Sequence, residues 1–113
     1  MGKFAVGQIV SSAFPFSDLT TKKLRPAIIV ALGDFDDIIL CQITSKAYSS
    51  SKPIGLTATD FMEGGLPQDS FARPNKLFTA DQSIVHKAYG TVSSSKLQQI
   101  LTEIRQLFTY SID

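Results

Sequence analysis

Residues 25–44, with the sequence RPAIIVALGDFDDIILCQIT, consist of two apolar runs separated by a polar cluster. The first run, 26–32, is continuously apolar and contains several β-branched residues, which is typical of a strand buried on both faces. The cluster GDFDD at 33–37 has the composition of a turn, and 38–44 has that of a return strand. We therefore expect 26–44 to fold as a β-hairpin.

Further strands are expected on both sides of this hairpin. Upstream, residues 4–14 carry apolar side chains at even positions, and this period of two indicates a strand. Downstream, the sequence predicts a short strand at 54–57 and longer ones within 70–80 and 83–92. Between these segments, Thr59 is a candidate N-cap for one helical turn.

The C-terminal part of the chain changes to a helical period. Within 93–108, apolar side chains recur every three or four residues, which indicates an amphipathic helix. These side chains are Leu97, Ile100, Leu101, Ile104 and Leu107 or Phe108. Ser95 followed by Gln98 fits a capping box. About five or six short strands followed by one helix predict an α+β fold, in which the helix covers one side of a small β-barrel.

Length and composition predict one domain over residues 1–113. Hydrophobic residues make up 43% and charged residues 19%, as in folded rather than disordered proteins. The N-terminus carries no signal-peptide pattern, and the longest apolar run is too short to span a membrane. Cys41 is the single cysteine, so an internal disulfide is excluded and a cytoplasmic location is expected. Its apolar neighbours favour a buried thiol over a nucleophile.

Basic residues concentrate in three stretches, although the formal net charge is only +1. They are Lys22, Lys23 and Arg25, then Lys46 and Lys52, then Arg73 and Lys76. Asp18 is the only acidic residue in these stretches. If the stretches converge in space, they form a basic face suited to a polyanion. The alternative is that they carry ordinary solvated loop charges.

Several kinds of site are excluded because their motifs are missing. The sequence contains no GxxxxGK[ST] phosphate loop, no GxGxxG after a strand and no Cys/His cluster for zinc. His86 is the single histidine, which excludes a two-histidine ribonuclease mechanism. Its position within a strand pattern favours a structural role. A catalyst with this sequence would depend on Arg, Lys, Ser, Thr and single carboxylates, and we expect neither a metal nor a cofactor.

Arg25 and Thr44 are the residues on which phosphate chemistry could be built. Arginine presents a planar, permanently charged fork of donors that matches phosphate. Pro26 restricts the backbone around Arg25. The hairpin should bring Arg25 beside Thr44 and Ser45 at one end, where they could hold a phosphodiester. The alternative is that Arg25 pairs with Asp18 and the hydroxyl residues merely end a strand.

Three stretches occur in an order and spacing that carry a family resemblance. VGQIVSSAFPFSDLTTKKLRPAIIV (6–30) looks like a first strand, a loop and the RP opening of a second strand. CQITS (41–45) is similar to an ITS motif, and SFARPNKLFT (70–79) to a later strand bearing serine, arginine and lysine. With the C-terminal helix, they resemble the PemK/MazF family, the toxins of bacterial type II toxin–antitoxin systems.

This resemblance implies a CcdB/PemK-like, SH3-type small β-barrel that works as a homodimer. It also implies a sequence-specific endoribonuclease that cuts single-stranded RNA, chiefly mRNA, and so arrests translation and growth. The RNA's own 2′-OH would attack, leaving a 2′,3′-cyclic phosphate and a 5′-OH without a metal or cofactor. The implied protein partner is a cognate antitoxin, whose acidic disordered tail would lie over the basic loop.

The resemblance also implies the site residues. Arg25 and Thr44 correspond to the catalytic pair. The implied RNA-binding residues are Phe16, Ser17, Asp18, Lys22, Lys23, Ser45, Lys46, Ser70, Arg73, Asn75 and Lys76. Asp18 lies in the loop where many members carry Gly-x-Glu. Asn75 stands where some relatives have an aspartate, and since an amide is no general base, its expected role is binding. Phe16 is expected to stack on a base or, alternatively, to belong to the core.

Two other functional classes stay open. One is a non-catalytic barrel that binds RNA or antitoxin without turnover. The other is a gyrase-targeting toxin of the CcdB kind, which would not need Arg25 and Thr44 to face a phosphate. Cleavage of RNA by the purified protein separates the endoribonuclease from both, and gyrase-dependent DNA breaks would indicate the last.

Overall fold

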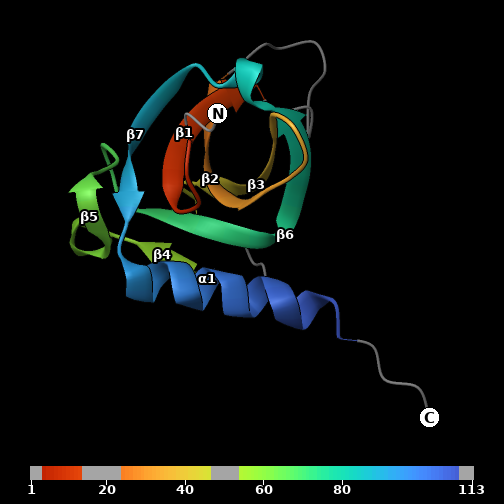
Figure 1. The fold of residues 1–113 in the computed structure, drawn as a ribbon. Helices are drawn as coiled ribbons and strands as arrows, with labels where there is room; N and C mark the ends of the chain where they lie inside the picture. The colour runs from red at the N-terminus through yellow and green to blue at the C-terminus, as the bar shows by residue number, and fades with distance from the viewer. Residues whose placement is uncertain (1–3, 14–23, 47–53, 110–113) are drawn as a thin grey trace.

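The computed structural model describes residues 4–13, 24–46 and 54–109. Within these ranges, seven strands form one antiparallel sheet in the order β4-β6-β3-β2-β1-β7-β5. The strands are β1 (Gln8–Ala13), β2 (Leu24–Leu32), β3 (Asp37–Thr44), β4 (Ile54–Leu56), β5 (Phe61–Gly64), β6 (Ser70–Asp81) and β7 (Lys87–Val92). The sheet curls into a half-open barrel, and helix α1 (Ser94–Leu107) runs along one side of it (Figure 1).

The predicted hairpin is confirmed, because β2 and β3 pair antiparallel. Across the turn, the Gly33 N–H donates to the carbonyl oxygen of Asp37 at 2.9 Å. Residues 27–30 are buried on both faces of the sheet, as their continuous apolar run predicts. Leu32 is 49% exposed instead, since it lies next to the turn, beyond the elements that cover the strand.

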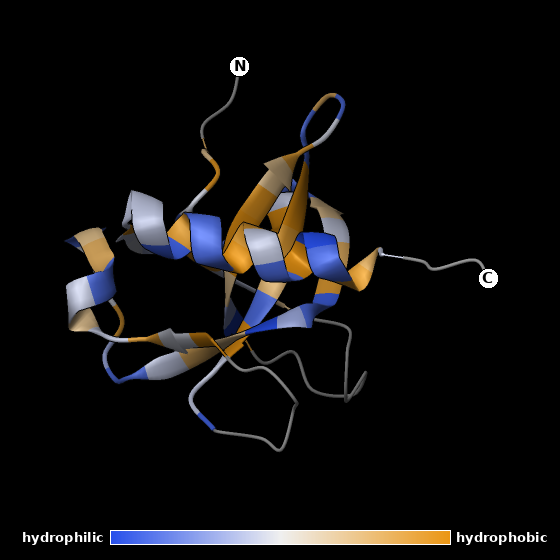
Figure 2. Cartoon of the chain, turned by 90° about the horizontal axis from the view of Figure 1, so that it is seen from below, coloured by the Kyte–Doolittle hydropathy of each residue, from blue (hydrophilic) through white to orange (hydrophobic). Residues whose placement is uncertain are grey.

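Side chains of β2 alternate between two hydrophobic clusters. Ile28 and Val30 belong to the cluster that includes Ile100 of α1, and Ala27 and Ile29 belong to the other. Figure 2 shows α1 lying across apolar strands. The α1 residues in the first cluster or packed against it are Leu97, Ile100, Leu101 and Ile104. These four predicted positions are confirmed. The fifth is wrong, because Leu107 and Phe108 are 48% and 73% exposed and pack against neither cluster, so the buried face of α1 ends at Ile104.

The start of α1 differs from the prediction. The N-cap is Ser93, whose hydroxyl oxygen accepts from the Lys96 N–H at 3.2 Å, so the capping box predicted at Ser95 is wrong. Three consecutive serines can each cap a helix. Ser93 takes this position because its own N–H donates to the Asp60 carbonyl oxygen at 2.7 Å and holds its backbone extended. No helix in the described part of the chain combines the length and the apolar composition needed to cross a bilayer.

The helical turn predicted at Thr59 is a single 3₁₀ turn over 58–60, and its N-cap is Thr57. The Thr57 N–H donates to the Asp60 carboxylate at 2.8 Å, which closes the turn two residues earlier than predicted. The chain then enters β5, a strand that the sequence did not predict. Its four residues are too few for a period to be visible, and the strand exists because it pairs with β7.

Two glycines allow β5 and β7 to approach closely. A Cβ added to Gly90 would lie 2.3 Å from the Glu63 carbonyl oxygen, and one added to Gly64 would lie 2.2 Å from the Tyr89 carbonyl oxygen. Gly64 also has φ +69°, a conformation that favours glycine. The contact fixes the direction in which the chain leaves β5.

Two predicted strands are shorter than expected. In 4–14, β1 begins only at Gln8, because Gly7 has φ +100° and breaks the extended backbone. In 83–92, a 3₁₀ turn occupies 82–84 and β7 begins at Lys87. His86 therefore precedes the strand in which it was predicted.

Candidate active site

A cleft of about 410 Å³ opens where four parts of the sheet meet. They are the start of β2, the end of β3, the start of β6 with the connection that precedes it, and β7. The described residues that line it are Arg25, Pro26, Ile43, Thr44, Ser45, Lys46, Leu66, Pro67, Gln68, Ser70 and Tyr89. Two of these are basic and none is acidic, so the described lining suits an anion.

Arg25 and Thr44 reach this cleft through the register of the hairpin. β2 and β3 pair with Ala27 opposite Gln42. Continuing this register by two residues on each strand places Arg25 opposite Thr44, and both line the cleft. The Arg25 side chain is exposed. The structure therefore brings together the two residues that the resemblance identifies as a catalytic pair, on strands whose inner parts are buried.

A local hydrogen bond orients the hydroxyl of Thr44. Its oxygen accepts from the backbone N–H of Lys46 at 3.2 Å. Since this bond uses the oxygen as acceptor, the hydroxyl hydrogen can still donate to a phosphate oxygen. Ser45 and Lys46 follow at the exposed end of the strand and line the same cleft. This side of the cleft, formed by Arg25, Thr44, Ser45 and Lys46, is called the cationic wall below.

The lining contributed by the connection from β5 to β6 and by β7 is mainly apolar and is called the aromatic wall. It consists of Leu66, Pro67, Gln68 and Tyr89. Ser70 holds this wall in place, because its buried hydroxyl donates to the Gln68 carbonyl oxygen at 3.0 Å. The sequence analysis placed Ser70 in the site but missed the aromatic wall. Gly64 and Gly90 were the signal that could have linked β7 to the connection between β5 and β6, because glycine within a strand marks a close approach of two backbones.

The sequence matches one described family over residues 5–108, nearly its full length. That family is the PemK-like, MazF-like toxin of type II toxin–antitoxin systems. The chain belongs to this family. The resemblance seen in its three motifs is therefore confirmed. No curated protein sequence matches the chain.

Solved structures of the same kind share the fold of this PemK-like toxin. An endoribonuclease from a mycobacterial species, in complex with its cognate antitoxin, aligns with TM-score 0.71 and 12% identity over 94% of this chain and 97% of that one. Mycobacterium tuberculosis toxin MazF-mt6 aligns with TM-score 0.70 and 16% identity over 93% and 99%. A further mycobacterial endoribonuclease gives TM-score 0.70 and 15% identity over 94% and 91%. The predicted α+β fold, a small curled barrel with a C-terminal helix, is confirmed.

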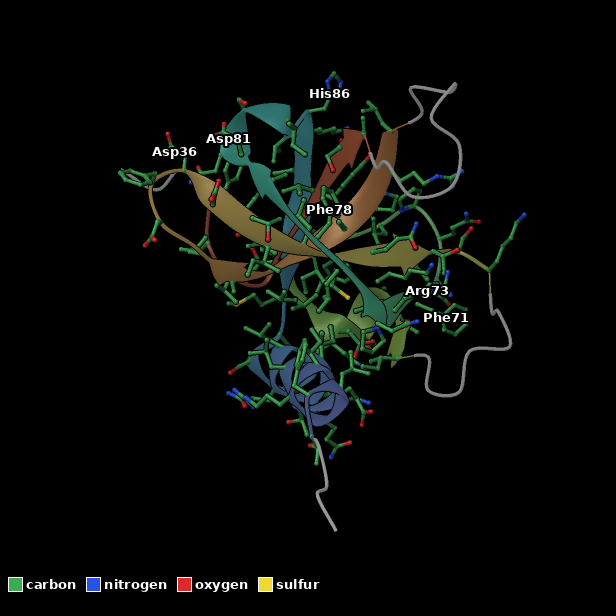
Figure 3. All side chains as sticks on the ribbon, turned by 90° about the vertical axis from the view of Figure 1, so that its right-hand side faces the viewer. Asp36, Phe71, Arg73, Phe78, Asp81 and His86 are labelled. Carbon is green, nitrogen blue, oxygen red and sulfur yellow. The ribbon has the colours of Figure 1, made fainter. Side chains whose placement is uncertain are left out.

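Three predicted RNA-binding residues of the PemK-like toxin lie outside the lining of the cleft. Arg73, Asn75 and Lys76 belong to a bulge of β6, since Ala72 pairs with Ile43 but Leu77 pairs with Cys41. Pro74 lies in this bulge, where a missing N–H breaks no ladder bond. Figure 3 shows Arg73 with Phe71 near the start of β6, far from Asp81 at its end. Contact of these residues with RNA stays a prediction.

The remaining predicted site residues fall outside the described part of the chain. They are Phe16, Ser17, Asp18, Lys22 and Lys23. The convergence of the three basic stretches can therefore be followed only for Arg25, Lys46, Arg73 and Lys76. Of these, Arg25 and Lys46 share the cleft.

His86 does not line the cleft of the PemK-like toxin. Its side chain is exposed, and Figure 3 shows it near Asp81 at the far end of β6. Its backbone N–H donates to the Ser11 carbonyl oxygen at 2.8 Å, which joins the turn before β7 to β1. Among the described residues, no group of three or more His, Cys, Asp or Glu side chains is placed to hold a metal ion.

Cys41 is fully buried in the first cluster, as predicted. Its thiol donates to the Arg73 carbonyl oxygen at 3.1 Å and so fixes the bulge to β3. Burial away from water raises the pKa of Cys41 from 9.0 to about 12. Because the folded state favours the protonated thiol, the stability from this group is complete below pH 9.0 and is lost as the pH rises towards 12.

We expect Cys41 to be inert in the native protein. At pH 8 an aromatic disulfide reagent should label it at least about 100-fold more slowly than in denaturant, because both access and ionisation are suppressed. The measurement is the release of the coloured thiolate with time. Equal rates in buffer and in denaturant would contradict the burial of this thiol.

Proposed function

We propose that this PemK-like toxin is a sequence-specific endoribonuclease that cleaves single-stranded RNA, chiefly mRNA, without a metal ion. The observation that carries the proposal is the shared cleft, in which Arg25 and Thr44 meet on adjacent strands. Family membership supports it, and two of the three similar structures are of endoribonucleases. Cleavage of mRNA arrests translation, which accounts for the toxicity.

In the proposed reaction, the ribose 2′-OH attacks the neighbouring phosphorus and the bond from phosphorus to O5′ breaks. The 2′-OH loses one proton and O5′ gains one, so no water is consumed. The products are a 2′,3′-cyclic phosphate and a 5′-OH. Arg25 stabilises the negative charge that develops on the non-bridging oxygens, and it donates a hydrogen bond to the departing O5′. Thr44 donates its hydroxyl to the phosphate, while Ser45 and Lys46 bind the backbone beside it.

We further infer the partners and the setting of this activity. The chain is proposed to act as a single domain over 1–113, to form a homodimer and to work in the cytoplasm, where mRNA is translated. Its protein partner is a cognate antitoxin with an acidic, disordered tail. The described lining of the cleft has basic but no acidic residues, which supports the binding of such a tail. One similar structure contains its own antitoxin.

The test is incubation of the purified protein, free of antitoxin, with a long single-stranded RNA in EDTA. A DNA strand of the same sequence, which lacks every 2′-OH, is the matched control. We expect discrete cuts in the RNA and none in the DNA, with cyclic-phosphate ends on the upstream RNA fragments. End mapping then gives the recognition sequence.

Other outcomes separate the competing functions. Intact RNA in the presence of folded protein would overturn the proposal. Binding of RNA or antitoxin without cleavage would then favour the non-catalytic barrel. DNA breaks that appear only with gyrase would favour the gyrase-targeting toxin.

A further inference from the structure

The two walls of the cleft differ in chemistry in a way that matches one nucleotide of RNA. The cationic wall presents a guanidinium, two hydroxyls and an ammonium, all suited to a phosphate. The aromatic wall presents two aliphatic side chains, an amide and a phenol ring. In a single strand, each phosphate is joined through ribose to a flat, apolar base. Because both walls line one cleft, a phosphate bound at the first can place its base against the second.

Tyr89 is the only aromatic side chain among the described residues that line the cleft. It is firmly held, because its ring packs partly buried against the first cluster and its carbonyl oxygen accepts from the Gly65 N–H at 3.2 Å. The Lys87 ammonium lies over the ring, 5.3 Å from its centroid. A ring fixed in this way loses little freedom when a ligand stacks on it.

We propose that Tyr89 is the stacking surface for the base next to the cleaved phosphodiester. The inference rests on the proposed function and adds a base-binding position to it. Stacking does not depend strongly on the base, since every base has a π face. On the same wall, the Gln68 side-chain amide can both donate to and accept from a base edge. Gln68 therefore supplies the discrimination between bases that stacking on Tyr89 lacks.

The Lys87 ammonium extends this arrangement beyond the cleft. It is exposed, and it places a positive charge beside the base-binding ring. A neighbouring phosphate of the same strand can pair with it while the ring holds the base. Thr44, Tyr89 and Lys87 thus offer binding groups for one phosphate, its base and a second phosphate of the same strand.

The test compares Tyr89→Leu with Tyr89→Phe. Loss of the ring should raise KM for a short RNA by about 5- to 150-fold, with kcat changed less than about threefold. Phenylalanine keeps the ring and should retain nearly the wild-type KM. Phe108→Leu is the matched control, because Phe108 is an exposed aromatic residue that does not line the cleft. Thermal melting establishes that each variant is folded.

A binding assay separates this inference from the proposed function. The probes are fluorescein-labelled 12-mers of oligo-A, -C, -G and -U that are 2′-O-methylated throughout, so that the nucleophile is blocked. Tyr89→Leu should weaken the tightest of them by the same factor as it raises KM. Gln68→Ala, a change at an exposed position that does not threaten folding, should bring the four affinities closer together.

Each outcome has a definite meaning. If the wild type cuts RNA and Tyr89→Leu changes neither KM nor affinity, the inference fails and the function stands. If the wild type binds the probes through Tyr89 but cuts no RNA, the function fails and the inference stands. If Tyr89→Phe loses as much as Tyr89→Leu, the hydroxyl rather than the ring is responsible, and stacking is overturned. A wild type that neither cuts nor binds overturns both.

Discussion

Alanine in place of Arg25 should lower kcat for RNA cleavage by about 10²- to 10³-fold, the usual cost of removing one donor to a developing charge. The structure offers a reason for so large an effect. Arg25 and Lys46 are the two basic residues among the described lining of the cleft, and only Arg25 has a planar fork that can hold two phosphate oxygens at once. The measurement is single-turnover cleavage of a mapped RNA substrate.

Two further variants isolate the role of the fork. Arg25→Lys keeps the positive charge but loses the bidentate geometry, so it should recover only part of the rate. Arg105→Ala removes an arginine of α1 that is also exposed, and it should leave the rate unchanged. All three proteins should melt near the wild-type temperature, because the side chains removed are exposed. A well-folded Arg25→Ala that cuts RNA at the wild-type rate would remove Arg25 from the mechanism.

Alanine in place of Gly90 should strongly destabilise the sheet. Its methyl group would lie 2.3 Å from the Glu63 carbonyl oxygen and 2.9 Å from the backbone at Gly64 and Gly65, so β5 and β7 must move apart. We expect the free energy of unfolding to fall by about 3 kcal/mol and Tm by roughly 10 °C or more. Differential scanning calorimetry provides the measurement.

Gly55 provides a matched control for this substitution. A Cβ added there would have no neighbour within 4 Å. Gly55→Ala should therefore leave Tm within about 2 °C of the wild type, or raise it slightly. If Gly90→Ala and Gly55→Ala had the same Tm, the close contact of β5 with β7 would be wrong. Since β5 leads directly into the aromatic wall, Gly90→Ala should also weaken RNA binding at temperatures where the protein is still folded.

The parts of the fold that could be predicted have signals confined to neighbouring residues. The hairpin is visible because two apolar runs flank a turn cluster. The continuously apolar run indicates a strand buried on both faces even when its neighbouring strands are unknown. The α1 face is visible because four apolar residues repeat at helical spacing. The meeting of Arg25 and Thr44 follows from the hairpin alone, so half of the candidate site was accessible before any tertiary contact was known.

The parts that could not be predicted depend on contacts between distant segments. β5 has four residues and exists through its pairing with β7. The N-cap of the helix is Ser93 rather than Ser95 because of a hydrogen bond to Asp60, more than thirty residues away in the sequence. The aromatic wall combines the connection after β5 with Tyr89. No local pattern reports that these residues share a cleft with Arg25.

The place of β1 in the sheet has a consequence for how the toxin is made. β1 lies between β2 and β7, so the earliest of the described strands to leave the ribosome is a neighbour of the latest. The cationic wall is complete once Lys46 has been translated, whereas the aromatic wall waits for Tyr89. Between the translation of Lys46 and that of Tyr89, a nascent chain therefore carries only one half of the cleft. We expect the message that encodes the toxin to be safe from its own product until Tyr89 has been translated.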